Sequence, residues 1–223
     1  MLYVNENMIS NLQNLQKKHI SISCQHKCLG SWIAMSITEF FCLQYMGEVG
    51  ANFEVYRNDD ITVEEIKKIS PRGILISPGP GTPQDSGISL QTVQDLGPST
   101  PLFGVCMGLQ CIGEAFGGKV VRSPYGVVHG KGSLVHYDDK LDGTLFSGLP
   151  NPFQAGRYHS LVIERDSFPH DALEIIAWTD DGLIMAARHR KYKHIQVCLH
   201  AIFLTTPCKS SRKLGCNAVK HVI

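Results

Sequence analysis

Cys106 is the residue best placed for nucleophilic chemistry, because it stands between an apolar run and a helical pattern. The run Leu102 to Val105 has the length and composition of a buried parallel strand. Gly104 and Gly108 flank the cysteine two residues away on either side, and glycine has no Cβ atom to block a sharp turn. The pattern Gly-x-Cys-x-Gly is the thiol counterpart of the nucleophile elbow, a strained turn that joins a strand to a helix. It predicts a nucleophile rather than a buried structural cysteine.

The residues after Cys106 predict a helix that begins at this turn. Leu109, Ile112 and Phe116 fall on one helical face, and Gly117-Gly118 supplies a stop signal. Cys106 should therefore lie at or beside the N-terminus of the helix. There the N–H groups without helical partners and the helix dipole favour a thiolate over a thiol, which is the form that a nucleophilic cysteine needs.

A second segment suited to chemistry is the loop Pro78 to Pro83, which follows the apolar strand pattern Gly73 to Ser77. Its prolines fix the backbone path and its glycines leave N–H groups open to close approach, which suits a carbonyl or an oxyanion held by main-chain donors. Taken alone, the segment also fits an ordinary turn between a strand and a helix. If the two strands are parallel, the loop and Cys106 meet at the carboxyl edge of one sheet, where α/β sheets build their sites.

The composition indicates one α/β domain without a global charge signal. The 223 residues suffice for one good-sized core, and 21 Lys and Arg against 20 Asp and Glu give a net charge of +1. This balance gives no argument for nucleic acid or an anionic membrane as a partner, and no apolar run approaches the roughly 18 residues of a membrane span. Eight irregularly spaced cysteines indicate reduced thiols rather than a disulfide framework. No metal or organic cofactor is expected.

The first half of the chain shows helical and strand patterns in alternation. The alternating stretch His19 to Cys24 is either an added edge strand or a disordered arm. Besides the segments above, the predicted elements are a helix opened by Ser36 and Glu39, a strand at 52–56, and a helix at 63–69 capped by Thr62 or Asp60.

Beyond Lys119 the hydrophobic period shortens toward two, which is typical of strands. Strands are predicted at 120–121, 126–137, 158–163, 173–178 and 183–189. Histidines at 129, 136, 159 and 189 fall in these strands, where histidine is usually a structural or surface residue. The whole pattern predicts an α/β fold with a mostly parallel central sheet flanked by helices and a smaller antiparallel sheet.

Three motifs in this order resemble the class I glutamine amidotransferases, whose fold is flavodoxin-like: Ser77 to Pro83, Gly104 to Gln110 and Arg157 to Leu161. Within that family the chain is most similar to the glutaminase subunits of plant plastid anthranilate synthases. The resemblance divides the chain into an N-terminal segment (1–42) outside the family pattern, an amidotransferase type 1 domain (43–196), and a C-terminal tail (197–223) outside it.

The resemblance also implies a role for each matched residue. In the family a cysteine attacks the side-chain amide of glutamine, ammonia leaves, and the glutamyl thioester is hydrolysed; Cys106 matches this nucleophile. Backbone N–H groups of Gly81 and Met107 match the oxyanion donors, and the elbow geometry also requires the second of these. The residues that match the binding site for the substrate glutamine are Gly79, Pro80, Gly81, Gln110, Ser160 and Leu161.

The sequence departs from the family pattern after Gln196, where the family has a Phe-His-Pro-Glu segment with the general base and the glutamate that orients it. Here His200 falls about one position early, which would turn it to the opposite face of a strand. No Asp or Glu occurs from residue 182 to 223. Loss of general-base catalysis costs about a hundred- to ten-thousandfold in rate, so the expectation is an impaired glutaminase.

Family membership implies a larger anthranilate synthase subunit that binds chorismate and receives ammonia for tryptophan biosynthesis. Four interpretations stay open. The chain is a glutaminase subunit of that enzyme, a non-catalytic form, such as a splice form, that docks on the large subunit, the small component of aminodeoxychorismate synthase, or an unstable fragment. The resemblance implies a plastid location. The first 30 residues lack the arginine and serine richness of a transit peptide, so a cytoplasmic location follows if the N-terminus does not target.

Overall fold

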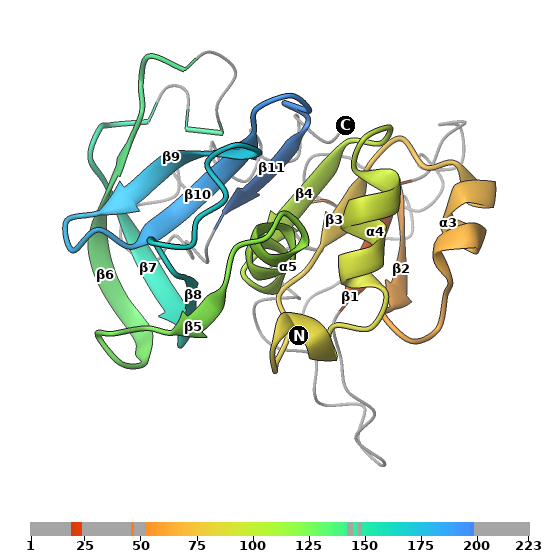
Figure 1. The fold of residues 1–223 in the computed structure, drawn as a ribbon, viewed down its shortest axis with the longest axis horizontal. Helices are drawn as coiled ribbons and strands as arrows, with labels where there is room; N and C mark the ends of the chain where they lie inside the picture. Colours follow the sequence, from red (N-terminus) through yellow and green to blue (C-terminus); the bar gives the residue numbers. More distant parts are fainter. Residues whose placement is uncertain (1–18, 24–45, 47–51, 142–144, 147–148, 199–223) are drawn as a thin grey trace, which may run out of the picture.

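The computed structural model describes residues 19–23, 46, 52–141, 145–146 and 149–198 (Figure 1). Within them, one twisted sheet of nine strands runs through the molecule in the order β2-β1-β3-β4-β11-β10-β9-β6-β7. Its first five strands run parallel to one another. The other four are joined to β11 and to one another in antiparallel pairs.

The strands of the parallel half are β1 His19–Ser23, β2 Phe53–Arg57, β3 Ile74–Ile76, β4 Leu102–Val105 and β11 Ile195–Cys198. Those of the antiparallel half are β6 Val128–Tyr137, β7 Phe153–His159, β9 Leu173–Thr179 and β10 Ile184–His189. A separate two-stranded antiparallel sheet pairs β5 Val120–Arg122 with β8 Leu161–Ile163. The predicted α/β fold is confirmed, with most of the antiparallel strands continuing the central sheet.

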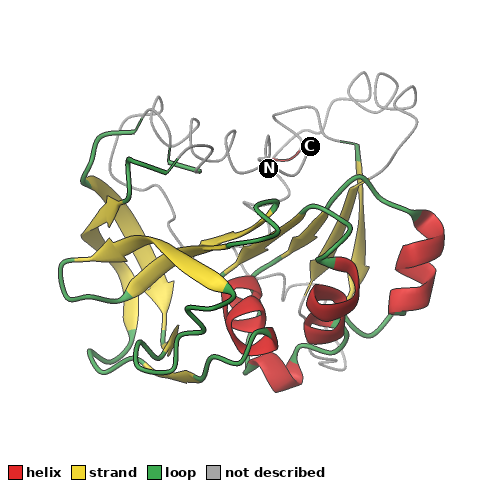
Figure 2. Cartoon of the chain, turned by 45° about the horizontal axis from the view of Figure 1, so that its top comes forward, coloured by secondary structure: helices red, strands yellow, loops and turns green. Residues whose placement is uncertain are grey.

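The described helices are α3 Val63–Ile69, the 3-10 helix η2 Pro83–Asp85, α4 Ser89–Leu96 and α5 Met107–Ala115. Figure 2 shows the helices on one side of the parallel strands. None of them is long and apolar enough to cross a membrane. The helix expected from Ser36 lies outside the described residues except for Met46, which is helical and 2% exposed.

The N-terminus of α3 shows why this short helix forms where it does. Of the two predicted caps, Thr62 is the one used: its hydroxyl accepts from the N–H of Glu65 at 3.3 Å. The Glu65 carboxylate accepts in return from the N–H of Thr62 at 2.8 Å. This capping box satisfies two helix-terminal donors, and the side chains of Val63 and Ile66 are buried below it.

The position of β1 corrects one prediction. The stretch from His19 was expected to be an edge strand or a disordered arm, but β1 lies inside the sheet, parallel to β2 on one side and to β3 on the other. β2 and β3 follow each other through helix α3 and are not hydrogen-bonded neighbours. The crossover leaves a gap of one strand, and β1 fills it.

Two further features differ from the sequence-based pattern. Helix α4 was not predicted, because two of the four residues on its buried face, Ser89 and Thr92, are polar. With only Val93 and Leu96 apolar on that face, the sequence shows no helical hydrophobic period. The predicted strand 158–163 is two strands, because the chain leaves the central sheet after β7 and enters the small sheet as β8.

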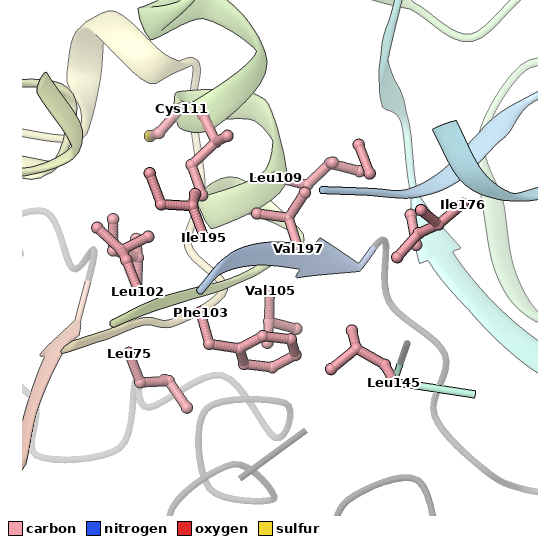
Figure 3. Close-up of a cluster of buried hydrophobic side chains, with 14 of the residues drawn as sticks. Leu75, Leu102, Phe103, Val105, Leu109, Cys111, Leu145, Ile176, Ile195 and Val197 are labelled. Atoms are coloured by element: carbon pink, nitrogen blue, oxygen red, sulfur yellow. The ribbon is translucent and has the colours of Figure 1, made fainter. Parts of the chain in front are cut away.

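The hydrophobic core lies on both faces of the two central parallel strands, β4 and β11. Leu102 and Phe103 on β4, and Ile195 and Val197 on β11, are at most 3% exposed. Figure 3 shows Leu109 and Cys111 of α5 over one face of this pair, and Phe103 and Val105 directed to the other. Burial on both faces explains the continuous apolar runs of these strands.

Candidate active site

Cys106 joins β4 to α5 with a backbone conformation that side chains rarely adopt. Its φ is 53° and its ψ is −95°. Among the described residues, Ser70 is the other non-glycine residue with positive φ. Such a conformation is costly and persists only where the surrounding structure imposes it. The predicted nucleophile elbow is therefore present in the backbone geometry.

The two glycines around Cys106 allow this turn to pack closely. A Cβ atom added to Gly104 would lie 2.6 Å from the carbonyl carbon of Gly108. One added to Gly108 would lie 2.7 Å from the carbonyl oxygen of Ile76 on the neighbouring strand β3. Both distances are too short for real contacts, so a larger residue at either position would force the neighbouring backbone to shift.

The turn places Cys106 at the N-terminal end of α5. The carbonyl of Cys106 accepts the first helical hydrogen bond, from Gln110 N–H at 3.1 Å. Met107 is the first residue of the helix, so its N–H is one of the four without an acceptor inside the helix. The Cys106 side chain is partly exposed, whereas Cys111 in the same helix is fully buried. A partly exposed cysteine at the positive end of a helix is an arrangement that favours the thiolate.

The loop after β3 lies beside the elbow, as the sequence predicts. β3 and β4 are parallel neighbours, with Ile76 aligned to Gly104, so their carboxyl ends meet at one sheet edge. Pro80 and Gly81 are exposed at the tip of the loop. Gly81 has a φ of 86°, a conformation that favours glycine. The exposed backbone at this tip is open to a ligand.

Gln110 lies one turn along α5 from Cys106, and its side chain is 3% exposed. Its Oε1 atom has no hydrogen-bond partner within the described part of the chain. Buried amide oxygens are nearly always paired, so an unpaired one next to a candidate nucleophile is the kind of group that a polar ligand satisfies.

Ser160 and Leu161 lie where β7 passes into β8. The carbonyl of Ser160 accepts from Ser123 N–H at 2.8 Å, which ties this junction to the end of β5. β8 reaches α5 where Ile163 packs against Gly113, in the C-terminal half of the helix. The two residues thus belong to a strand beside α5, and their contact with glutamine stays a prediction.

The candidate bases are histidines, and the structure removes one of them. His189 is 6% exposed, and its Nδ1 atom accepts from the N–H groups of Lys191 at 3.0 Å and Tyr192 at 3.1 Å. Burial, reinforced by the charges of His194 and Lys191, lowers the pKa of His189 below its ordinary value. A neutral ring that accepts two backbone bonds is structural, as predicted for a histidine in a strand.

His200 lies outside the described residues, so its role as base stays a prediction. The strand before it does bear on the site. β11 pairs with β4 so that Cys198 is aligned with Val105, the residue before Cys106. β11 therefore ends at the same sheet edge as the elbow.

Four side chains that the sequence analysis did not single out connect the segment just after the loop to α5. The Cys111 thiol donates to Ser86 Oγ at 3.3 Å. The Gln84 amide donates to the Glu114 carboxylate. These partners are 25 and 30 residues apart along the chain, so no local sequence pattern could reveal them.

A cleft of about 710 Å³ opens elsewhere in the molecule, between the small sheet and the β9–β10 turn. Its wall includes Tyr125 and Trp178, and also His136, whose Nε2 atom lies 2.6 Å from Asp180 Oδ1. The Tyr125 hydroxyl donates to the Asp181 carbonyl at 3.0 Å. None of the residues assigned to the candidate active site lines this cleft.

Comparison with known proteins agrees with this geometry. The glutamine amidotransferase class-I family model matches residues 35–200. The chain is 94% identical over 161 residues to the chloroplastic anthranilate synthase beta subunit 2 of Oryza sativa subsp. japonica, covering 72% of this chain and 59% of the relative. It is 50% identical over 153 residues to anthranilate synthase component 2 of Cyanophora paradoxa, covering 69% of this chain and 78% of that protein.

Among solved structures, the chain is similar to a glutamine amidotransferase of Thermotoga maritima, with a TM-score of 0.61 and 12% identity. That likeness covers 82% of this chain and 75% of the other, and it concerns the fold. The chain spans about six-tenths of the length of the curated plant relatives that it matches. Because the family model covers most of the chain, the chain belongs to the class I glutamine amidotransferases.

Proposed function

We propose that this chain is the glutaminase subunit of a plant anthranilate synthase, which releases ammonia from glutamine for tryptophan biosynthesis. The observation that carries the proposal is the positive-φ backbone conformation of Cys106 at the N-terminus of α5, beside the exposed glycine loop. The choice of anthranilate synthase is supported by the 94% identity to a protein of that name.

In the proposed reaction, the Cys106 thiolate attacks the side-chain carbonyl carbon of glutamine and forms a carbon–sulfur bond. The N–H groups of Gly81 and Met107 hold the oxyanion of the tetrahedral intermediate. The carbon–nitrogen bond then breaks, and the nitrogen takes up a proton and leaves as ammonia. Water attacks the resulting thioester, which frees glutamate and returns the thiolate. The balance is one glutamine and one water converted to one glutamate and one ammonia.

Glutamine is held by groups on three elements in this proposal. Gly79, Pro80 and Gly81 offer the backbone of the loop, and Ser160 and Leu161 supply the junction of β7 and β8. Gln110 supplies a buried amide whose oxygen accepts from the substrate. Since that oxygen has no partner among the described residues, bound glutamine would remove a desolvation cost that the unliganded protein carries.

The partner in this proposal is the large anthranilate synthase subunit, which binds chorismate and uses the ammonia. The relatives' names also support a plastid location, because the plant beta subunits are called chloroplastic. The chemistry needs no metal or organic cofactor, since the thiol and the backbone donors provide the nucleophile and the charge stabilisation. The small component of aminodeoxychorismate synthase would perform the same half-reaction for another chorismate-using partner.

One observation favours a second candidate, a non-catalytic subunit that docks on the large subunit. No Asp or Glu follows residue 182, so the stretch that includes His200 offers no carboxylate to orient a histidine base. Without that base, glutamine would bind and react only slowly.

The test is anthranilate formation by this chain mixed with the large subunit, with glutamine or ammonia as nitrogen donor. The glutaminase proposal predicts that glutamine supports product formation and that Cys106→Ala abolishes it, while ammonia-dependent formation continues. If only ammonia supports product formation and the chain still co-purifies with the large subunit, the chain is the docking subunit. If the mixture forms 4-amino-4-deoxychorismate with an aminodeoxychorismate partner instead, the pathway assignment is wrong and the glutaminase assignment holds.

A further inference from the structure

The loop that carries Gly79 and Gly81 has an exposed tip and a fixed base. At the base, the Cys111 thiol donates to Ser86 Oγ at 3.3 Å, and the Ser86 hydroxyl donates to the Pro83 carbonyl at 2.6 Å. Cys111 is fully buried and Ser86 is 1% exposed. This chain of bonds joins α5 to η2, the 3-10 helix that directly follows the loop tip.

A second bond joins the same two elements. The Gln84 amide donates to the carboxylate of Glu114. Glu114 stands three residues after Cys111 in α5 and so falls on the same helical face. Glu114 is partly buried, and this burial raises the pKa of its carboxyl above the ordinary value.

The segment that follows Ser86 is held by a third element. The carbonyl of Asn58, just after β2, accepts from Ile88 N–H at 3.3 Å. Gly87 has a φ of 58°, and a Cβ atom there would lie 2.4 Å from that same carbonyl oxygen. The chain is therefore fixed at 84–88, while Pro80 and Gly81 stay exposed.

We propose that Gln84 and Ser86 are positioning residues that set the glutamine-binding loop against the nucleophile helix. Through Glu114 and Cys111 they fix the distance between the loop's N–H groups and the sulfur of Cys106, without touching the substrate. An oxyanion donor acts only when it is placed in advance, so a small displacement of the loop weakens transition-state binding. The inference deepens the proposed function and rests on it for the identity of the site.

The experiment compares two alkylating reagents on the full chain without its partner. The diazo ketone analogue of glutamine reacts with a thiolate with loss of dinitrogen and needs the glutamine site, whereas iodoacetamide needs only the thiolate. Mass spectrometry of the peptide that contains Cys106 gives both rates, and fragmentation of this peptide separates label on Cys106 from label on Cys111. The ratio of the two alkylation rates reports how the loop is positioned, and it does not depend on glutamine turnover.

Gln84→Ala and Ser86→Ala should each lower this ratio by about two- to tenfold, the range that the loss of one hydrogen bond corresponds to. Gln84→Glu should lower it as well, because it places two carboxylates together. Adding Glu114→Gln to Gln84→Glu restores a donor and an acceptor at the same two positions, so this exchange should restore the ratio. The matched control is Gln91→Ala, because Gln91 is also exposed and bonds within its own helix, to Asp95.

Equal ratios in wild type, Gln84→Ala and Gln84→Glu would overturn the inference. A parallel loss of both alkylation rates would also overturn it, because it would point to a change in the thiol itself. A wild-type chain that reacts no faster with the glutamine analogue than with iodoacetamide would overturn it as well. Thermal unfolding of each variant shows whether it folds; if Ser86→Ala does not, the exposed Gln84 variants still decide. A chain that is labelled selectively but releases no ammonia would reject the proposed function and leave this inference standing.

Discussion

At the scale of single residues, the central feature is the cost of the Cys106 backbone. A non-glycine residue in a sparsely populated conformation costs about 1–3 kcal/mol. The neighbours leave it no alternative, because Gly104 packs on Gly108 and Gly108 packs on the Ile76 carbonyl. The strain turns one side chain out of a buried strand to a helix N-terminus, and so it serves the proposed chemistry rather than stability.

Gly108→Ala should therefore damage both stability and the site. The added methyl group meets backbone atoms that cannot rotate away, so the free energy of unfolding should fall by about 1–3 kcal/mol, and selective labelling of Cys106 should be lost. Gly132→Ala is the matched control, because its methyl group meets only the end of the Gln154 side chain. Similar denaturation midpoints for the two variants would show that the close contact at Gly108 is relieved cheaply.

His189 gives a pH prediction. Its pKa is lowered in the folded protein, so between the folded value and about 6.5 the unfolded chain binds more protons at this ring. The stability due to neutral His189 is complete above about pH 6.5 and is lost as the pH falls through the folded pKa. His189→Gln keeps a polar side chain but cannot titrate, and urea titrations should show a shallower loss of stability below pH 6.5. Parallel curves for the two proteins would contradict this.

At the scale of elements, local patterns are read correctly where one face and one cap decide the structure. Helix α5 and strand β4 follow from a buried run, an elbow and an apolar face, and all three are local. Helix α4 was missed because Ser89 and Thr92 occupy its buried face. The place of β1 depends on the gap between β2 and β3, which is a property of the whole sheet.

The candidate site likewise has parts that the sequence could predict and parts that it could not. The elbow and the loop could be predicted because each follows directly from a strand, and parallel strands bring their carboxyl ends together. The bonds of Gln84 to Glu114 and of Ser86 to Cys111 link segments whose proximity depends on how η2 packs on α5. The junction at Ser160 was placed within one strand because nothing local marks a change of sheet.

The capping box of α3 gives a prediction at this scale. Thr62→Ala removes the hydroxyl that accepts from Glu65 N–H, and a lost N-cap costs about 1 kcal/mol. Chemical denaturation should show this loss, while Thr62→Ser should keep most of the stability. α3 supplies no candidate site residue, so both variants should keep the wild-type ratio of Cys106 labelling rates. A changed ratio in Thr62→Ala would show that α3 acts on the site.

At the scale of the whole molecule, β11 joins the parallel and antiparallel halves of the sheet. It pairs with β4 on one side and with β10 on the other, and its described side chains are buried. The strand thus holds the second half of the chain against the nucleophile strand, and it ends at the edge where the proposed reaction takes place.

Docking on the large subunit should be independent of the nucleophile. Cys106→Ala changes a single partly exposed side chain, so its dissociation constant for the large subunit, measured by calorimetry, should equal that of the wild type. A large loss of affinity in this variant would place Cys106 in the subunit interface and would contradict a purely catalytic role.

The most direct measurement is detection of the thioester itself. The full chain is mixed with isotopically labelled glutamine, quenched in acid and digested, and the peptides are analysed by mass spectrometry. We predict a labelled glutamyl group on the peptide that contains Cys106, absent in Cys106→Ala, and longer-lived if no base assists hydrolysis. Glutamine consumption without this adduct, or with label on another cysteine, would contradict the assignment of Cys106 as the nucleophile.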